Sequence, residues 1–304
     1  MSIVQLLLPA FVASLILTGI HAYLGVHVVE RGVIFVDLSL AQIAALGSTV
    51  AYLMGHDLHS GTAYLYSLGF TFLGAAIFAS TRMHRKTRIP QEAVIGIVYA
   101  VSAAVAILVM SKATQETEHL KEMLVGNILS VTWAELGKTA LLYSAVGVFH
   151  YIFRERFLLI SMHEEEAERR GFSIRFWDFL FYVSFGFVVT SSVAIAGVLL
   201  VFCFLIVPSV AAMLFAERLG PRLAIGWTLG ALVSAGGVAL SFVIDLPTGA
   251  TIVATFGAML LLLALVRWAF FRRAIPASRK PGDPVDLHGP VPALEPGPGS
   301  SRPS

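Results

Sequence analysis

The sequence contains few charged residues. Asp, Glu, Lys and Arg together make up 13% of its 304 residues, whereas soluble domains average about 25%. So few charges cannot cover a water-facing surface on a chain of this length, and 57% of the residues are hydrophobic. The composition therefore excludes an ordinary soluble domain and predicts a chain whose solvent is largely lipid.

Cysteine and the common catalytic motifs are scarce or absent. The single cysteine, Cys203, excludes an internal disulfide and a cysteine-rich metal site. Its apolar surroundings predict a small buried side chain. The sequence has no Gly-x4-Gly-Lys-Ser/Thr motif, so this chain does not bind ATP through a P-loop, and it has no His-Glu-x-x-His motif. We therefore predict that the chain is not an enzyme, and we predict no catalytic residue and no bound cofactor.

Long apolar runs fill most of the chain. A helix crosses the hydrocarbon core in about 20 residues. The run 176–215 is too long for one crossing, so we predict a break near Ser191–Gly197. The fold class is then all-α, a polytopic transmembrane helical bundle of about nine spans, with eight or ten as open alternatives. The predicted spans are 3–28, 33–54, 61–81, 92–110, 137–153, 176–194, 196–216, 222–244 and 249–271.

Two features divide the chain into a membrane domain and a tail. Residues 1–273 contain all the predicted spans, whereas residues 274–304 are rich in Pro, Gly and Ser. Such a segment cannot bury enough apolar surface to fold, so it is predicted to be a disordered cytoplasmic tail.

The basic residues predict the orientation. Cytoplasmic loops of membrane proteins are enriched in Lys and Arg. With nine spans and the C-terminus inside, every Lys and Arg lies on the inner side except Lys112, Lys121 and Lys138. The N-terminus is therefore predicted to lie outside. His150 and Asp178 are expected at the inner interface.

The longest inner segment, 154–175, has the pattern of a short helix. Ser161 is a candidate N-cap, acidic residues fill the first turns, and Gly171 can end the helix in the left-handed conformation. A short helix between two spans suits docking into a groove of another protein. The alternative is a solvated, charged loop.

Small residues recur on one predicted span. Gly226, Gly230 and Ser234 are four residues apart, which places them on one helix face. Small side chains allow two membrane helices to approach closely. We therefore predict that this face packs against another helix.

Several segments together resemble a known family. They are Leu24–Asp37, Gly126–Trp133, the Glu-Ala-x-x-x-Gly pattern of Glu166–Gly171, Gly197–Ala212 and Asp245–Gly249. Their order and spacing are similar to those of the membrane (permease) subunits of the zinc/manganese/iron ABC importers. The resemblance extends over most of the chain, although each motif alone is weak.

The resemblance implies the partners of the chain and its place in the cell. It implies a multi-pass permease in the bacterial cytoplasmic membrane, paired with itself as a homodimer and surrounded by lipid. An ABC ATP-binding subunit would hydrolyse ATP, and an extracytoplasmic metal-binding protein would deliver a divalent metal ion. No nucleic acid is implied. The residues that would couple the chain to the ATPase are Glu164, Glu165, Glu166, Ala167 and Gly171.

The resemblance also points to metal-binding residues, with one departure. The family's second span carries an Asp and, four residues later, a His. Aligned on Gly47, this chain has Gln42 in the histidine position, and Asp37 lies one residue away from the aspartate position. A neutral oxygen ligand suits manganese better than zinc. We predict Asp37, Gln42 and His21 as metal-binding residues. Two alternatives stay open: Gln42 forms a hydrogen bond to another helix, or the second span provides only a polar passage.

Asp37 has two readings from the sequence alone. An acid inside a span costs about 2.5–3.5 kcal/mol on insertion scales, so it is a functional candidate by default. The alternative is an ion pair with Arg31 near the inner face. Glu92 lies at the start of the fourth span, in a place that resembles an acidic position of the family.

Two other functions remain open at this stage. One is an ABC permease for a chelated metal, such as a siderophore or cobalamin. The other is a non-transport membrane scaffold, in which the Glu-Ala-x-x-x-Gly helix would have no use. The sequence does not choose among zinc, manganese and iron.

Overall fold

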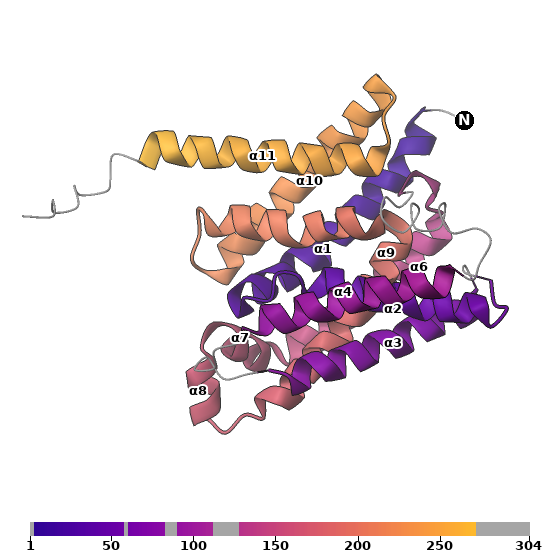
Figure 1. Ribbon diagram of the computed structural model, residues 1–304. Coiled ribbons are helices and arrows are strands. Elements are labelled where there is room, and N and C mark those ends of the chain that lie inside the picture. The colour runs from indigo at the N-terminus through magenta and orange to yellow at the C-terminus, as the bar shows by residue number, and fades with distance from the viewer. Residues whose placement is uncertain (1–2, 58–59, 83–89, 112–127, 272–304) are drawn as a thin grey trace, which may run out of the picture. The chain divides into compact units, whose positions relative to one another are not determined.

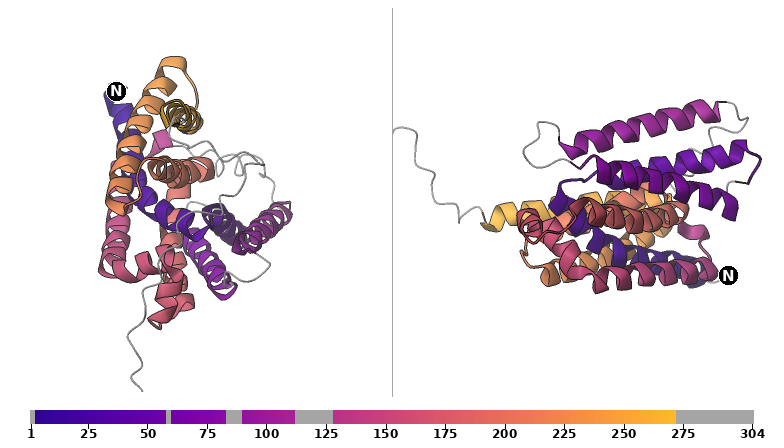
Figure 2. Two further views of the ribbon diagram at one scale, coloured as in Figure 1. Left: turned by 90° about the vertical axis from the view of Figure 1, so that its left-hand side faces the viewer. Right: turned by 90° about the horizontal axis from the view of Figure 1, so that it is seen from below.

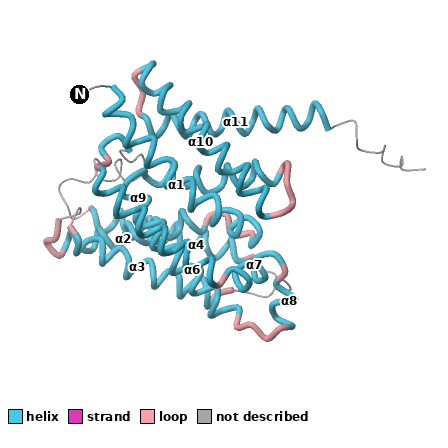
Figure 3. The backbone as a smooth tube through the Cα atoms, turned by 180° about the vertical axis from the view of Figure 1, so that it is seen from behind, coloured by secondary structure: helices cyan, strands magenta, loops and turns pink. Residues whose placement is uncertain are grey.

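The computed structural model describes residues 3–57, 60–82, 90–111 and 128–271, and these residues form helices joined by short loops (Figure 3). The predicted tail lies outside the described residues. The helices are α1 (Ile3–Arg31), α2 (Val36–Leu53), α3 (Gly61–Ser80), α4 (Gln91–Met110), η1 (Ile128–Ser130), α6 (Trp133–Ile152), α7 (Arg154–Met162), α8 (Glu164–Arg169), α9 (Ile174–Met213), α10 (Leu219–Ile244) and α11 (Thr248–Phe271), as Figure 1 shows.

The helices correspond closely to the predicted spans. Seven of those described, α1 to α4 and α9 to α11, are long and apolar enough to cross a membrane. The helix α6 contains Glu135, Lys138 and His150 and is less apolar. Each predicted span overlaps one helix or one half of α9, so the predicted all-helical bundle of about nine spans is confirmed.

A sharp break divides α9 at Gly197. Gly197 has φ 75° and ψ 162°, a conformation outside the helical region. This region of backbone space is essentially reserved for glycine, because a Cβ would clash there. The break lies in the predicted interval Ser191–Gly197. It allows one apolar run of 40 residues to form two helical halves with different directions.

Close contacts of small residues hold α1 against α9 and α10. A Cβ on Gly25 of α1 would overlap the carbonyl oxygen of Leu205 on α9, and a Cβ on Gly230 of α10 would overlap Thr18 of α1. Gly226, Gly230 and Ser234 are all buried, which confirms the predicted packing face on α10. In lipid, van der Waals contact between helices replaces the hydrophobic drive available in water, so such close approach stabilises the bundle.

A second group of helices consists of α2, α3 and α4. A Cβ on Gly47 of α2 would lie 2.7 Å from the backbone oxygen of Tyr66 on α3, so these two helices also pack closely. The helix α4 packs on α2 and lies at the edge of the group (Figure 2). Its most apolar stretch is 22% buried, compared with 61% for α2, so α4 presents most of its surface outward.

The end of the bundle that carries α8 also carries the ends of several long helices. We call it the α8 end. The helix α8 packs chiefly on α7. Arg31 at the end of α1, Arg82 just after α3 and Asp178 in the first turns of α9 meet there through ion pairs. The α8 end therefore joins a short surface segment to three long helices.

Candidate functional site

Two acidic side chains lie together where α2 and α4 begin. Asp37, in the first turn of α2, is 2% exposed, and its Oδ1 is buried without a hydrogen-bond partner among the described residues. Glu92, in the first turn of α4, accepts a hydrogen bond from the backbone N–H of Phe35 at 3.0 Å. The second oxygen of Glu92 is likewise buried, with no partner within the described part of the chain. Glu92 thus binds the backbone two residues before Asp37, so the two acidic residues are neighbours at the start of α2.

This acidic pair has a chemical consequence. Two like charges repel one another, and buried oxygens without partners are costly. A cation between Asp37 and Glu92 would relieve both effects. The unpartnered oxygens of Asp37 and Glu92 could therefore accept a positive ion.

The second half of α9 covers the start of α2. The ring of Phe202 stacks on Phe35, with ring centroids 6.3 Å apart. The neighbouring Cys203 lies on the same half of α9 as Phe202. Cys203 is half-buried and packs against the apolar core rather than being fully buried as predicted. The break at Gly197 therefore directs the second half of α9 onto the acidic pair.

The structure places Gln42 on a different side of α2 from Asp37. Five residues separate them, which rotates Gln42 by about 140° around the helix axis. Gln42 is half-buried. Gln42 and Asp37 could therefore bind the same ion only if the ion contacted two faces of α2. A metal-binding role for Gln42 stays a prediction.

His21 is fully buried on α1 and belongs to a hydrogen-bonded group. Its Nδ1 lies 2.8 Å from the carbonyl oxygen of Leu17, and its Nε2 lies 3.2 Å from the hydroxyl of Ser192. A carbonyl only accepts, so Nδ1 carries the proton and Nε2 is the acceptor. Within the described ranges, no three His, Cys, Asp or Glu side chains are grouped so that they could hold a metal ion. A ligand role for His21 also stays a prediction.

Arg31, the alternative partner of Asp37, pairs with Asp178 instead. The Nη1 of Arg31 lies 2.6 Å from Asp178, and Arg82 pairs with the other oxygen of the same carboxylate. Arg82 also pairs with Glu164 at 3.1 Å. We call these four residues, Glu164, Arg82, Asp178 and Arg31, the charge chain. The reading in which Arg31 neutralises Asp37 is therefore wrong.

Asp178 and His150, which the sequence predicts at the inner interface, are 0% and 1% exposed, so both are buried inside the protein. Their depth in the membrane stays a prediction. The burial of Asp178 follows from its two arginine partners. One signal in the sequence could have identified its importance, since Asp178 is the only charged residue in the run 176–215. Arg82 had no comparable signal, because it begins a loop that contains several basic residues.

Buried imidazole and hydroxyl groups surround the charge chain. His27 Nδ1 lies 2.7 Å from the hydroxyl of Ser161, which accepts a hydrogen bond from Arg31 at 2.8 Å. His150 bonds through Nε2 to the hydroxyl of Ser184 at 2.8 Å. Ser161 therefore does not cap the docking helix as predicted. It lies inside α7, and His163 occupies the N-cap position of α8.

The end of α8 follows the predicted pattern. Gly171 has φ 75°, the left-handed conformation. Its N–H donates to the carbonyl of Glu168 at 2.9 Å, and the N–H of Phe172 donates to the carbonyl of Ala167 at 3.1 Å. This pair of bonds is a Schellman motif, which satisfies carbonyls that the end of a helix leaves unpaired. Ala167 is fully buried, so it anchors α8 on the bundle.

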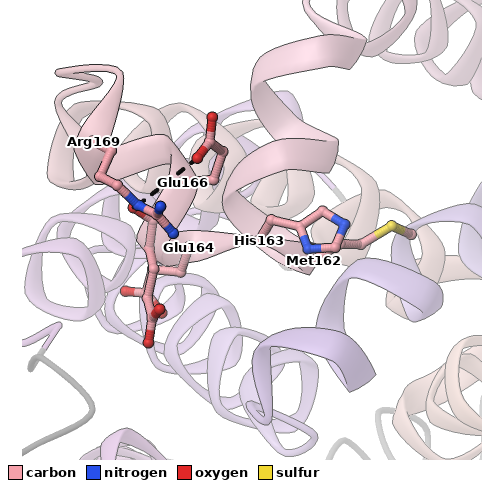
Figure 4. A pocket seen from close by; sticks show the side chains of 6 residues that line it. Met162, His163, Glu164, Glu166 and Arg169 are labelled. Carbon is pink, nitrogen blue, oxygen red and sulfur yellow. Dashed lines mark hydrogen bonds and ion pairs between the residues drawn. The ribbon is translucent and has the colours of Figure 1, made fainter. Parts of the chain in front are cut away.

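The outer face of α8 is polar and lines a hollow. Its lining consists of Met162, His163, Glu164, Glu165, Glu166 and Arg169, whose six side chains are drawn in Figure 4. Glu166 is bonded to Arg170 at 2.8 Å and lies 3.8 Å from Arg169. The hydrogen bond from Arg170 lowers the pKa of Glu166 below its usual value. The carboxylate is therefore ionised at neutral pH, and α8 offers fixed charges to a docking surface.

Comparison with known proteins agrees with this architecture. A model of the ABC 3 transport family matches residues 3–267. The manganese transport system membrane protein MntC of Listeria innocua is 27% identical over 244 residues, which cover 80% of this chain and 84% of that protein. The chelated iron transport system membrane protein YfeC of Yersinia pestis is 27% identical over 207 residues, 66% of this chain and 70% of that protein.

A solved structure shows the same fold. A chain of PsaBC from Streptococcus pneumoniae, in complex with Fab, matches with a TM-score of 0.70 and 23% identity. The match covers 84% of this chain and 90% of that chain. The all-helical arrangement described above is therefore shared with that protein.

Proposed function

Since the chain belongs to the ABC 3 transport family, we propose that it is the membrane-spanning permease of an ATP-driven importer of a divalent transition-metal ion. The relatives named above are described as manganese and chelated iron transport proteins. The observation that carries the proposal is the acidic pair of Asp37 and Glu92, whose buried oxygens lack partners among the described residues.

The proposed assembly supplies what this chain lacks. ATP hydrolysis takes place in a separate ATP-binding subunit, because this sequence contains no P-loop motif. An extracytoplasmic metal-binding protein delivers the ion, and two copies of the chain form the pathway. The chain lies in the bacterial cytoplasmic membrane with the N-terminus outside and the C-terminus inside. The α8 end then faces the cytoplasm, where the ATP-binding subunit docks on Glu164, Glu165, Glu166, Ala167 and Gly171.

The proposed mechanism is a change between two states. The ion enters from outside and reaches the acidic pair near the inner end of the bundle. The ATP-binding subunits move α8 when they close, and the long helices swing between outward-open and inward-open arrangements. Only a difference in contacts between the two states can drive this change. The Schellman ending and the buried Ala167 hold α8 rigidly against the bundle, so a displacement of α8 is passed on to the helices it packs on.

The donor atoms favour a hard ion. Carboxylate and amide oxygens suit manganese better than zinc, which prefers imidazole and thiolate ligands. Asp37 and Gln42 would contribute oxygens, and His21 is the one imidazole among the proposed residues. We therefore propose manganese as the cargo in preference to zinc.

The test is uptake by the reconstituted transporter. The permease and its ATP-binding partner are placed in proteoliposomes, and uptake of manganese, iron and zinc is measured with the wild type and with Asp37→Asn. Loss of even an outer neighbour of a metal typically lowers affinity or activity about 10–100-fold, so Asp37→Asn should lower uptake at least about tenfold.

The matched control is Glu217→Gln, which removes an exposed acid from the loop between α9 and α10. It should leave uptake unchanged. Unchanged uptake in Asp37→Asn would remove the acidic pair from the pathway. Absence of uptake of any of the three ions by the wild type would reject the proposed function itself.

A further inference from the structure

The charge chain links α8 to three long helices through consecutive ion pairs. Glu164 is the first residue of α8, Arg82 follows α3, Asp178 lies in the first turns of α9, and Arg31 ends α1. Along the chain, Arg82 bridges Glu164 and Asp178, and Asp178 bridges Arg82 and Arg31. The charges alternate in sign and sum to zero.

Because the side chains of the charge chain are buried, its ion pairs cannot separate without a large energetic cost. The side chains of Asp178 and Arg31 are 0% and 1% exposed, that of Arg82 is 9% exposed and that of Glu164 is 19% exposed. Water therefore cannot replace a lost partner at the inner end, and a buried ion without its partner is strongly unfavourable. A displacement of Glu164 thus has to be followed by Arg82, unless the pair breaks.

A second connection ties the same surface segment to α1. Ser161 of α7 accepts a hydrogen bond from Arg31 and is bonded to His27, at 2.8 and 2.7 Å. The guanidinium of Arg31 also lies 4.0 Å above the ring of Phe181, a cation–π contact. The segment formed by α7 and α8 is therefore held at two points. Ser161 binds Arg31 at the end of α1, and Glu164 binds Arg82 just after α3.

We propose that the charge chain is the connection through which movement of α8 reaches the inner ends of α3, α9 and α1, and that Arg82 is its essential positioning residue. The inference rests on the proposed function, because it assumes that an ATP-driven partner moves α8. It goes further by assigning the transmission to four side chains. Arg82 belongs to neither the acidic pair nor the surface of α8 that would contact the partner.

Arg82 is also the residue whose loss the fold can best tolerate. In Arg82→Gln, Asp178 keeps its pair with Arg31, and Glu164, at the more exposed end of the chain, can be hydrated. The variant should therefore fold and assemble with the ATP-binding subunit. The variant loses the connection between Glu164 on α8 and Asp178 on α9.

The experiment is a double-mutant cycle in the assembled transporter. Arg82→Gln, Glu164→Gln and the double variant are reconstituted with the ATP-binding subunit, and the number of metal ions imported per ATP hydrolysed is measured. Each single variant should lower this ratio about tenfold, within the usual range for coupling between sites. The double variant should be no worse than Glu164→Gln alone, because Glu164→Gln already breaks the link that Arg82→Gln removes. Arg82→Lys, which keeps the charge, should recover part of the ratio, and Glu217→Gln should match the wild type.

A second readout does not depend on the cargo. Spin labels are attached to cysteines at Ile77 on α3 and Leu232 on α10, both exposed, in a Cys203→Ser background. ATP should change the distance between the labels in the wild-type complex and should not change it in the Arg82→Gln complex. If the wild type imports no metal but still shows this difference, the proposed function is wrong and the charge chain stands.

Three results would overturn the inference. One is an unchanged ratio of ions to ATP in Arg82→Gln, together with a normal ATP-induced change in the label distance. Another is a double variant whose loss is the product of the two single losses, because that would show two independent effects. Failure of Arg82→Gln and Arg82→Lys alike to assemble with the ATP-binding subunit would reduce Arg82 to a structural role and would also overturn it.

Discussion

Single residues decide how closely the long helices approach one another. Gly19 and Gly25 both lie on α1, but their surroundings differ. Nothing lies within 4 Å of a Cβ on Gly19, whereas a Cβ on Gly25 would overlap the backbone of Leu205 and the hydroxyl of Ser209. On α1, a glycine is therefore required where another helix lies against it, at Gly25, and not at Gly19.

This difference gives a prediction at the scale of the residue. Gly25→Ala should destabilise the protein by about 1–3 kcal/mol, because the extra methyl group overpacks the contact between α1 and α9. Gly19→Ala should be neutral or stabilising by roughly 0.5–1 kcal/mol, because alanine is the better helix former. Thermal unfolding of the two variants in detergent measures the effect. Equal stability of both would contradict the close packing of α1 on α9.

The short helix α8, through which we propose that coupling takes place, depends on contacts along its length for its position. The helix α8 contains six residues, too few to be stable as an isolated helix. Its position depends on the buried Ala167, on the ion pair of Glu164 and on the Schellman ending at Gly171. Each of these acts on a different part of the helix.

At the scale of the element, we predict that Gly171→Ala weakens coupling. A left-handed conformation costs an alanine about 1–2 kcal/mol, so the end of α8 should fray. The number of ions imported per ATP should fall, while the melting temperature should change little, since nothing lies within 4 Å of Gly171. Gly171→Asn is the matched control, because asparagine tolerates this conformation. Equal coupling in both variants and the wild type would show that the ending of α8 is not needed.

The positions of the basic residues predict the orientation of the whole molecule in the membrane. The loop after α2 should lie outside and the α8 end should lie inside. Arg175, near the α8 end, and His56, after α2, are both described and lie in different connections of the bundle. These two positions can report on opposite sides of the membrane.

Thiol labelling tests this orientation. In a Cys203→Ser background, His56→Cys should react with a membrane-impermeant maleimide in intact cells. Arg175→Cys should react only after the cells are permeabilised, because this position is predicted to lie on the cytoplasmic side, which the maleimide cannot reach in intact cells. The background protein without either cysteine is the control. Labelling of Arg175→Cys in intact cells would place the α8 end outside and would reject docking of a cytoplasmic ATP-binding subunit.

The sequence determined the features that depend on local patterns. Apolar runs gave the helices, because the backbone in lipid must satisfy its own hydrogen bonds. The position of Gly197 in the long run gave the break in α9, and the Glu-Ala-x-x-x-Gly pattern gave the Schellman ending at Gly171. Each depends on neighbours in the chain or on one backbone conformation, and both can be read from residue types.

The tertiary structure decided which buried charges meet. Arg31 could be paired with Asp37 from the sequence alone, yet the fold brings Asp178 to Arg31 across 147 residues of chain. The same fold leaves one oxygen of Asp37 buried with no partner among the described residues, while Glu92 binds the backbone N–H of Phe35, two residues before Asp37. The physical reason is that electrostatic partners are chosen by distance in space, and the packing of α1, α3 and α9 sets that distance.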